Sequence, residues 1–586
     1  MKPTRVFDFV THQAENYPRE DALASKVNGQ WKAYSLAEVQ ENANKLSHGL
    51  LKLGVAKDNK VAIVSENRPE WNFVDLATQQ IGAVSVPMYP TITIEDYRYI
   101  IGHADVTVIF ASSTDLYQKV KTALDGNEAI KVYTFDEVEG AEHWTAVRDL
   151  NPDGDDQDIE ALKAQVTEDD LLTIIYTSGT TGRPKGVMLT HKNIVSNSLA
   201  ASKVVLLDAG KSRALSFLPL SHIYERTGIY FYLYLGVSVY YAESIDKIAD
   251  NLKEVKPHTF NTVPRLLEKV FDKIVAKGKE LSGGARKLFF WALDLAHEYD
   301  PNKNQGFVFN LKLKVARKLI FSKWREALGG ELFMLSSGGA ALQPRLARIF
   351  WAAGIKVCEG YGLTETSPII TASIATEKDI RIGQVGAPIE GVEIKIAEDG
   401  EILCRGNNVM KGYYKAPDKT AEVLKDGWFH TGDIGEISEG RFLRITDRKK
   451  EMFKTSGGKY VAPQLIENKF KESLYIEQCI VIGDGRKFPS ALIVPNFDAL
   501  KKWCEEVGHA YTSDEDIVKD ERVLAHIETE IKPLNGTFAQ WEQVKRYALL
   551  TQPFTIETGE MTAKLSMKRR VIHKKYEEKI EALYNV

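Results

Sequence analysis

Residues 176–186, YTSGTTGRPKG, combine glycines, hydroxyl side chains and one lysine, the residue types that hold phosphate groups. The run follows the apolar segment 171–176, which we expect to be a buried strand. Glycines let the backbone approach a ligand, hydroxyls bind phosphate oxygens, and Lys185 adds a positive charge. The run is not a Walker A loop, because Pro184 precedes the lysine and Gly186 follows it. A flexible turn is the alternative, but the density of these residue types favours a polyphosphate-binding loop.

Two further glycine-containing runs follow strand-like segments. Residues 336–341, SSGGAA, come after the apolar run 332–335, and their small side chains would let a flat ring lie against the backbone. A close-packed strand-to-helix turn explains that run equally well. Residues 359–366, EGYGLTET, add an aromatic ring, a hydroxyl and a carboxylate that could hold Mg²⁺. This is not a dinucleotide-binding fingerprint, because Glu365 occupies the place of the third glycine.

The later part of the chain carries two more polar runs. In residues 428–434, WFHTGDI, Asp433 follows a glycine turn and could accept hydrogen bonds from two ribose hydroxyls. Residues 446–459, TDRKKEMFKTSGGK, are dense in positive charge that could neutralise phosphates. A solvated face is the alternative explanation of this charge. Each late motif is weak alone, and their occurrence together and in order is what points to one site.

The elements around these runs alternate between helix and strand. Helix-like spacing over 36–53 and 71–81 alternates with strand-like segments at 60–65 and 83–87, which predicts a mostly parallel sheet covered by helices. Residues 266–328 are helix-rich, aromatic and basic, and we expect a helical insertion there. Short β-like pieces with glycine turns predict a small antiparallel unit between 383 and 446. An α+β pattern restarts after Asp447, where we place a domain boundary.

Composition narrows the class of protein. The 586 residues include 76 Lys or Arg and 80 Asp or Glu, a net charge of −4, which argues against a generic nucleic-acid binder. The four cysteines show no zinc-site or disulfide-scaffold spacing. The N-terminus lacks the apolar core of a signal peptide, and the longest apolar run, 229–242, is shorter than a bilayer span. We therefore expect a cytoplasmic protein.

The motifs, taken together, resemble the acyl- and aryl-adenylate-forming superfamily, which includes acyl-CoA synthetases, peptide-synthetase adenylation domains and firefly luciferase. The resemblance covers nearly the whole chain, and its most specific part is the 176–186 run. Within the superfamily the chain resembles a long-chain fatty-acid–CoA ligase. Three features favour that group: LPLSHIYER at 218–226, VPRLLEK at 263–269, and the helical insertion that follows.

The resemblance implies an α/β protein of two domains. Residues 1–447 would form a large N-terminal domain of mixed, mostly parallel sheets covered by helices, with a small β-rich unit. Residues 448–586 would form a smaller α+β lid that swivels at Asp447. The substrates implied are ATP, a long-chain fatty acid and CoA, with Mg²⁺ as the metal ion and no nucleic-acid partner. Both a monomer and a homodimer remain compatible with the sequence.

The resemblance also assigns roles to individual residues. Lys185, Glu365 and a late lysine would be catalytic, and Thr177 and Glu365 would contact Mg²⁺. Thr364 would touch the α-phosphate. The residues implied in ATP binding are Thr177, Ser178, Gly179, Thr180, Thr181, Gly182, Gly338, Gly339, Ala340, Glu359, Gly360, Tyr361, Gly362, Thr364, Asp433, Arg448, Lys450 and Lys454. On the lid, Gly457, Gly458 and Tyr460 match a loop that would serve the CoA-dependent step.

The sequence departs from the family pattern at the late catalytic lysine. That lysine usually stands in a Gly-Lys element before paired basic residues, whereas here the stretch reads EMTAKLSMKRR, residues 560–570, without the glycine. Lys564 is the candidate and Lys568 the rival. The tail from Lys564 to Tyr576, with basic residues at Lys568, Arg569, Arg570, Lys574 and Lys575, could touch an anionic membrane, although a solvated helix face is the favoured explanation.

The acyl pocket is the least determined part of the prediction. His222, Tyr230 and Tyr234 are candidates for its wall, with a satisfied core histidine and a plain buried helix as the alternatives. Other activities also remain open: a fatty-acyl-AMP ligase that loads a carrier protein, an aryl or medium-chain acyl-CoA ligase, and a non-catalytic nucleotide sensor. The presence of Lys185, Glu365 and the other charged residues of the motifs argues against the sensor.

Overall fold

The computed structural model describes residues 2–177, 183–555, 557–561 and 567–585. Its main sheet has eight strands in the order β19-β9-β8-β4-β3-β5-β6-β7. Strands β3 to β8 run parallel where they pair, and β9 and β19 add an antiparallel edge. The bounds are β3 Lys60–Val64, β4 Val84–Met88, β5 Val106–Ala111, β6 Lys131–Thr134, β7 Glu142–His143, β8 Leu171–Thr177, β9 Lys185–Thr190 and β19 Gly412–Tyr413.

The strands and helices predicted in the first part of the chain are confirmed. Strand β4 is buried along its whole length and β3 along almost all of it, as expected for parallel strands that helices cover on both faces. The helices are α2 (Leu36–Lys52) and α3 (Pro69–Gln80). A capping box starts α2: the Ser35 hydroxyl accepts from the Glu38 amide, and the Glu38 carboxylate accepts from the Ser35 amide.

Two further sheets lie beside the main one. The first has the order β12-β13-β14-β15-β16, and the second has the order β10-β11-β1-β2. Their bounds include β1 Leu23–Val27, β2 Gln30–Tyr34, β10 Arg213–Ser216, β11 Ser238–Tyr241, β12 Asn261–Thr262, β15 Ile369–Ala372 and β16 Ala387–Pro388. The strands that reach the polar motifs are β13 (Met334–Ser337) and β14 (Lys356–Gly362). The expected antiparallel unit is also present: β17 (Val392–Ile396), β18 (Glu401–Gly406), β21 (Trp428–Ser438) and β22 (Phe442–Arg448) pair in antiparallel fashion.

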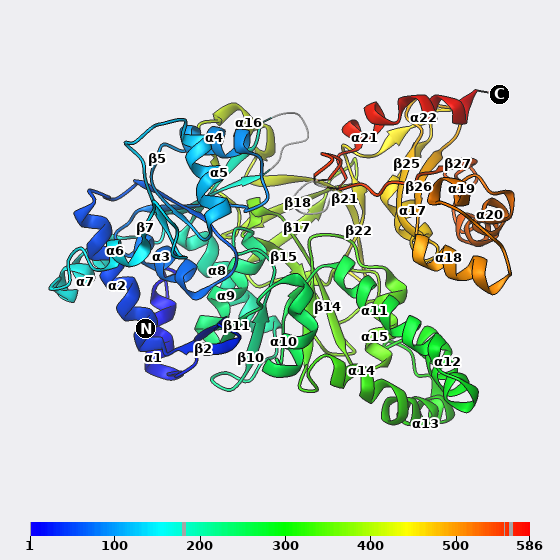
Figure 1. The fold of residues 1–586 in the computed structure, drawn as a ribbon, viewed down its shortest axis with the longest axis horizontal. Helices are drawn as coiled ribbons and strands as arrows, with labels where there is room; N and C mark the ends of the chain where they lie inside the picture. Colours follow the sequence, from blue (N-terminus) through cyan, green and yellow to red (C-terminus); the bar gives the residue numbers. More distant parts are fainter. Residues whose placement is uncertain (1, 178–182, 556, 562–566, 586) are drawn as a thin grey trace.

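The predicted insertion is helical throughout most of its length. Its elements are α11 Pro264–Glu280, α12 Gly283–Glu298, α13 Gly306–Ala316, the π-helical turn η2 Arg317–Phe321 and α14 Ser322–Ala327. Their inward side chains share a hydrophobic core with α15 (Pro344–Ala352) and the neighbouring strands. Figure 1 shows the insertion, in green, as a projection from the body of the molecule, with α13 at its outer edge.

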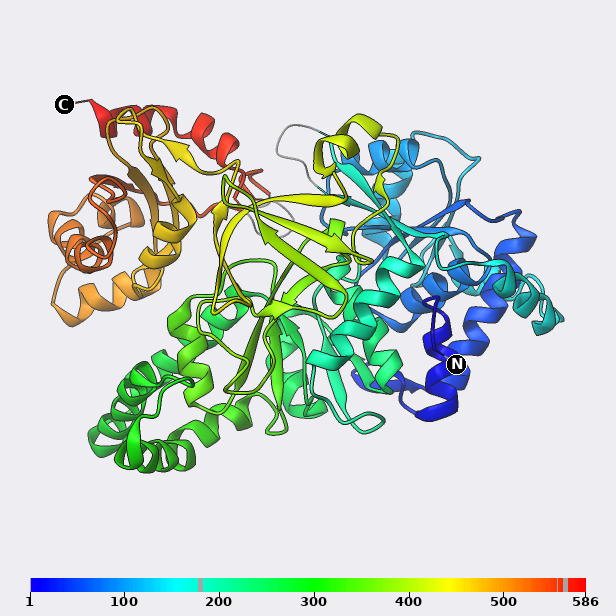
Figure 2. The ribbon, with the colours of Figure 1, turned by 180° about the vertical axis from the view of Figure 1, so that it is seen from behind.

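The chain after residue 450 packs around cores of its own. A three-stranded sheet, β25 (Ile476–Ile482), β26 (Ser490–Pro495) and β27 (Arg546–Leu549), is covered by α17 (Pro463–Phe470) and α20 (Glu521–Asn535) on one side. The helices α21 (Arg569–Lys575) and α22 (Glu577–Tyr584) contribute to a second core. Both cores consist of residues from Phe453 onward. Figures 1 and 2 show this part, in yellow to red, to one side of the rest.

The cysteines and the helices were examined in the sequence for disulfides and for membrane spans. The four cysteines are buried and free, and no disulfide joins them. Among the described residues, no helix combines the length and the apolar character that crossing a bilayer requires.

Candidate active site

One large cavity lies where β8, β13 and β14 end. Its volume is about 1380 Å³, above the roughly 300–1,000 Å³ of a typical small-molecule site. Segments from distant parts of the chain line it, including residues after 447. The predicted site residues found in its lining are Thr177, His222, Gly338, Gly339, Glu359, Gly360, Tyr361, Gly362, Thr364, Glu365, Arg448, Lys450 and Lys568. Ser178, Gly179, Thr180, Thr181, Gly182 and Lys564 lie outside the described residues.

Close packing explains one glycine in the lining. A β-carbon on Gly362 would approach the carbonyl oxygen of Pro368 to 1.8 Å, which no side chain can tolerate. Gly339 has φ +80°, in the left-handed region. Gly338 packs on Tyr224, whose ring carbon would lie 3.3 Å from an added β-carbon. The backbone at these turns therefore borders the cavity without intervening side chains.

Thr177, Lys185 and Glu365 come together at one end of the site. Thr177 and Lys185 are direct cross-strand partners on β8 and β9. The Lys185 ammonium lies 4.7 Å from the ring centroid of Tyr413, and the Tyr413 hydroxyl donates to Glu365 Oε1 at 2.9 Å. Burial lowers the pKa of Lys185, and the positive charges of Lys450 and Lys419 lower it further. An anion bound here would relieve that repulsion between like charges.

A second polar group surrounds Asp433. Its carboxylate is buried, accepts from the Tyr361 hydroxyl at 2.7 Å and lies 3.3 Å from Arg448 Nε. Asp433 and Arg448 are register partners on β21 and β22, so the sheet itself holds them together. Burial raises the pKa of Asp433, while the charge of Arg448 and the hydrogen bond from Tyr361 act in the opposite direction. Tyr361 and Arg448 also line the cavity, which connects this carboxylate to it.

Glu359 adds a carboxyl group of a different kind. It is buried in the cavity lining, and burial raises its pKa to about 8 despite hydrogen bonds from the backbone of Gly383 and Leu342. The group is therefore mostly protonated and neutral at pH 7. A neutral carboxyl can both donate and accept a hydrogen bond, which suits the edge of an uncharged ring better than a phosphate.

One face of α9 (Ile223–Leu235) lines the cavity. Tyr224, Thr227, Gly228 and Phe231 occupy positions i, i+3, i+4 and i+7 and are all in the lining. His222 caps the helix and accepts from the Tyr224 amide at 3.0 Å. Tyr224 and Phe231 were not among the predicted site residues. Helical periodicity counted from His222 is the signal that would have found them.

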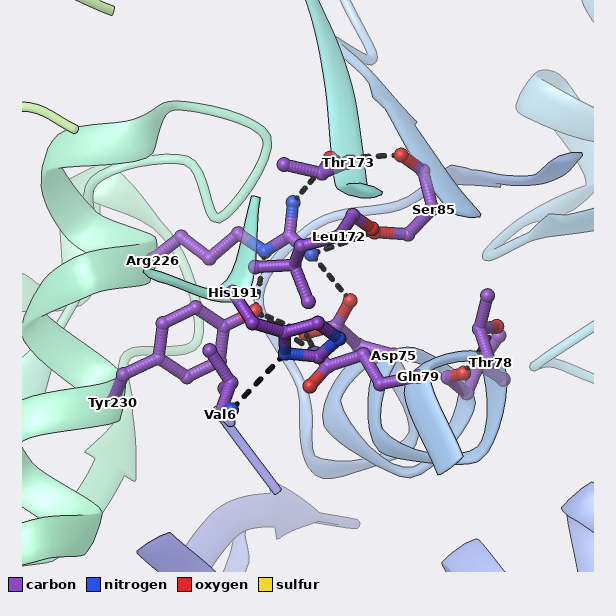
Figure 3. A network of polar contacts seen from close by, with 11 residues as sticks. Val6, Asp75, Thr78, Gln79, Ser85, Leu172, Thr173, His191, Arg226 and Tyr230 are labelled. Atoms are coloured by element: carbon purple, nitrogen blue, oxygen red, sulfur yellow. Dashed lines mark hydrogen bonds and ion pairs between the residues drawn. The ribbon is translucent and has the colours of Figure 1, made fainter. Parts of the chain in front are cut away.

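Tyr230 and Tyr234 are not among the described residues that line the cavity. Tyr230 lies on another face of α9, whereas Tyr234, three residues after Phe231, lies further along the helix than the lining residues. The Tyr230 hydroxyl donates to Asp75 at 2.5 Å inside a buried network (Figure 3). Tyr234 stacks on His12 with ring centroids 4.5 Å apart. Of the three residues expected at the acyl wall, His222 is therefore in the described cavity lining, and Tyr230 and Tyr234 are not.

The network in Figure 3 joins the elements behind the cavity. The Arg226 guanidinium on α9 bonds to Asp75 on α3 at 2.5 Å, to Ser85 on β4 at 2.6 Å and to Thr173 on β8 at 2.8 Å. Arg226 and Asp75 are each 1% exposed. Because α9 carries the cavity-lining face and β8 leads into the 176–186 run, the hydrogen bond from Arg226 to Thr173 fixes two walls of the site relative to each other.

The remaining predicted residues lie near the cavity or away from it. Ala340 directly follows the lining residues Gly338 and Gly339 in the sequence. Lys450, which comes after Asp447, is in the cavity lining. Lys454 and Tyr460 pair on a small hairpin, β23 (Phe453–Lys454) and β24 (Tyr460–Val461), with Gly457 and Gly458 at its turn. Among the described residues this hairpin contributes nothing to the cavity lining, and Tyr460 is 62% exposed.

The late basic residues border the cavity: Lys568, Arg569 and Arg570 are all in its lining. Arg569 is also held by the C-terminal part of the chain, because its guanidinium bonds both carboxylate oxygens of Glu467 at 2.7 Å and Glu451 at 3.1 Å. No group of three or more His, Cys, Asp or Glu side chains that could hold a metal ion by itself occurs in the described part of the chain. A Mg²⁺ at Thr177 and Glu365 would need phosphate oxygens as further ligands, which is the usual way that nucleotide sites hold Mg²⁺.

Comparisons with known proteins agree with this geometry. The chain is 34% identical over 566 residues to long-chain-fatty-acid–CoA ligase FadD15 of Mycobacterium bovis, covering 95% of this chain and 93% of the relative. It is 34% identical over 593 residues to long-chain-fatty-acid–CoA ligase 5 of Mus musculus, covering 95% and 85%. By structure it resembles the anthranilate CoA ligase AuaEII in complex with anthranoyl-AMP, with a TM-score of 0.73, 18% identity and coverage of 97% and 96%. ATP-bound MatB from Rhodopseudomonas palustris has the same fold, with a TM-score of 0.71, 22% identity and coverage of 98% and 99%.

Family models match most of the sequence. The model of the AMP-binding enzyme matches residues 10–414, and the model of the AMP-binding enzyme C-terminal domain matches residues 451–586. The first match contains the 176–186, 336–341 and 359–366 runs and the second contains the late basic residues, while Asp433, Arg448 and Lys450 lie between the two matches. The chain therefore belongs to the AMP-binding enzyme family.

Proposed function

We propose that this chain is a long-chain fatty-acid–CoA ligase that first forms acyl-AMP and then the CoA thioester. The observation that carries the proposal is the cavity, which combines a cationic, hydroxyl-bearing end with apolar side chains such as Met88, Ile100, Val205 and Phe231. Each buried CH₂ of an acyl chain contributes about 0.8 kcal/mol, so an apolar wall selects long acids. The relatives named as long-chain-fatty-acid–CoA ligases support the same substrate class.

The first half-reaction joins two anions. A fatty-acid carboxylate oxygen forms a bond to the α-phosphorus of ATP, and the bond to the bridging oxygen breaks, releasing pyrophosphate. Lys185 and Lys450 supply positive charge at this end of the cavity, and Thr364 would contact the α-phosphate. Thr177 and Glu365 would hold Mg²⁺, which when bound neutralises phosphate charge. Positioning in line supplies much of the remaining acceleration.

The nucleoside would lie against the β13 and β14 turns. Gly338, Gly339 and Ala340 on one side and residues 359–361 on the other would hold the adenine, with the neutral Glu359 carboxyl at its edge. Asp433 and Arg448 would bind the ribose hydroxyls, because their register pairing places a carboxylate and a guanidinium beside Tyr361. Two enzymes of the same fold, AuaEII in complex with anthranoyl-AMP and ATP-bound MatB, support an adenine nucleotide as a ligand of this chain.

In the second half-reaction the CoA thiolate attacks the acyl carbonyl carbon and AMP leaves. We propose that residues 448–586 act as a lid that pivots at Asp447 between the two steps. The separate cores from Phe453 onward support a body that can move as a unit. Lys568 or Lys564 would serve the first step, and the hairpin with Gly457, Gly458, Lys454 and Tyr460 would replace it for the second.

The test is release of pyrophosphate and AMP from ATP, Mg²⁺ and palmitate, with and without CoA. The proposal requires palmitoyl-CoA formation that depends on all four components. Lys185→Met should lower the rate of pyrophosphate release about 100-fold or more, because it removes charge stabilisation at the phosphates. Lys192→Met is the matched control and should keep the wild-type rate, because this partly exposed lysine is paired with Glu168.

Other outcomes would overturn parts of the proposal. Pyrophosphate release without thioester formation would indicate a fatty-acyl-AMP ligase that uses a carrier protein. Turnover with benzoate-type or medium-chain acids but not with palmitate would indicate an aryl or medium-chain acyl-CoA ligase instead of a long-chain one. ATP binding without turnover on any acid would indicate a nucleotide sensor.

A further inference from the structure

Helix α13 presents an apolar face to solvent. Phe307 is 81% exposed and Val308 is 64% exposed, and the side chains of Leu311, Leu319 and Val315 are 52%, 46% and 41% exposed. These five residues fall at helical spacing along α13 and the π-helical turn η2 that continues it. Isolated exposed apolar residues are ordinary in proteins, but five on one helix face form a patch of the kind that marks an interaction surface.

The opposite face of the same helix packs against the hydrophobic core of the insertion. Leu313, Ala316 and Ile320 are buried, and Phe309 is partly buried against the same core. Counted at 100° per residue, these side chains point away from Phe307, Leu311 and Val315. The exposed apolar face is therefore not needed to attach α13 to the protein, and its composition has to be explained by something outside the fold.

The charge around this face has one sign. Residues 301–325 contain seven Lys or Arg residues and no Asp or Glu. Lys312, Lys314 and Lys318 are exposed, flank the apolar stripe on both sides and make no ion pair with any residue that the structure describes. Arg317 and Arg325 instead donate to backbone carbonyls of Ala352 and Ala353 and help hold the insertion together.

We propose that the exposed face of α13 and η2 binds the surface of an anionic lipid bilayer. Its apolar side chains would enter the headgroup region, and the flanking lysines would lie at the level of the lipid phosphates, as in interfacial amphipathic helices. A second copy of the chain fits this face poorly, because the same unpaired lysines would face one another. The position of α13 at the outer edge of the insertion leaves room for a flat partner (Figure 1).

The C-terminal basic tail is a weaker membrane site than its sequence suggests. Arg569 is bound to Glu467 and Glu451, and Lys575 pairs with Glu560. Lys568, Arg570 and Lys574 are exposed and have no ion pair among the described residues, as is true of the α13 lysines, but in the described part of the tail the only exposed large apolar side chain beside them is Val571. The structure thus favours α13 over the tail as the lipid-binding surface.

The test is sedimentation of the full-length protein with vesicles of phosphatidylglycerol and phosphatidylcholine, compared with phosphatidylcholine alone. We expect binding to the anionic vesicles that weakens as salt is raised. Phe307→Ser with Leu311→Ser should weaken it about tenfold or more, and Lys312→Glu with Lys318→Glu should do the same. Ile245→Ser and Lys121→Glu are the matched controls: Ile245 is 75% exposed and Lys121 is exposed, both outside the insertion.

The outcomes separate this site from its alternatives. Wild-type binding that the α13 variants do not change would overturn the proposal, as would no binding to anionic vesicles. Loss of binding after Lys574→Glu, with the α13 variants unaffected, would assign the tail instead. A self-association that Leu311→Ser abolishes in light scattering, without any vesicle binding, would identify a second copy as the partner. Circular dichroism and palmitate activation in detergent-free solution show whether each variant is folded and active.

Discussion

Removal of Arg226 should destabilise the protein more than removal of any comparable surface arginine. Its guanidinium is 1% exposed and holds Asp75, Ser85, Thr173 and the Tyr230 hydroxyl at 2.5–2.8 Å. Arg226→Met keeps most of the side-chain length but leaves the Asp75 carboxylate buried without its cation. Such an uncompensated buried charge costs about 3–5 kcal/mol, because the interior does not solvate it.

Arg148→Met is a close internal control. Arg148 also pairs with an aspartate, Asp149 at 2.7 Å, and its guanidinium lies 5.4 Å from the ring of Trp144, as that of Arg226 lies 5.2 Å from the ring of Trp71. Arg148 is 30% exposed, so water replaces the lost partner and the cost should be about 1 kcal/mol or less. The two substitutions therefore differ in burial rather than in chemistry.

The assay is urea unfolding followed by fluorescence and circular dichroism, on Arg226→Met, Arg148→Met, Asp75→Leu and the double variant Asp75→Leu with Arg226→Met. The double variant removes both charges, so it should be more stable than the sum of the two single losses predicts. The reasoning fails if Arg226→Met costs no more than Arg148→Met, or if the two losses are simply additive. Pyrophosphate release by the folded fraction would show whether α9 still aligns the cavity wall.

Three further predictions concern pH, metal and backbone. Burial raises the pKa of Glu225 from 4.5 to about 7, so the folded state holds its proton more tightly and wild-type stability should fall as pH rises between these values. Glu225→Gln should therefore gain about 3 kcal/mol over wild type between pH 4.5 and 8 in denaturant titrations, and equal pH profiles would contradict this. Tyr413→Phe removes the hydrogen bond that orients Glu365, and it should raise the Mg²⁺ concentration needed for half-maximal pyrophosphate release severalfold while leaving palmitate dependence unchanged. Gly362→Ala places a β-carbon 1.8 Å from the Pro368 carbonyl and should abolish adenylate formation or folding, whereas Gly427→Ala, in open space, would at most lower stability through its φ of +75°.

The chemistry of the site was readable from short runs of sequence. Phosphate binding demands glycines, hydroxyls and a cation within a few residues of a strand end. The 176–186, 359–366 and 446–459 runs contain these residue types, so each of them predicted a part of a phosphate-binding site. The alternation of helix and strand also followed from local patterns, because the period of apolar residues depends only on nearby positions. The comparisons confirmed the family that these runs indicated.

Only the tertiary structure decided which side chains face the cavity. Tyr230 and Phe231 are neighbouring aromatic residues on α9. Tyr230 lies in the buried network around Asp75, whereas Phe231 is in the cavity lining. That difference depends on the crossing of α9 with α3 and β8, which is set by contacts such as those of Arg226 with Asp75 and Thr173, 151 and 53 positions away in the sequence. The hydrogen bond between Tyr361 and Asp433 likewise joins two different sheets, which no local pattern predicts. On α13, packing buries one face in the core of the insertion and leaves the other apolar face exposed. A local pattern shows that a helix has an apolar face, but packing determines which partner that face meets.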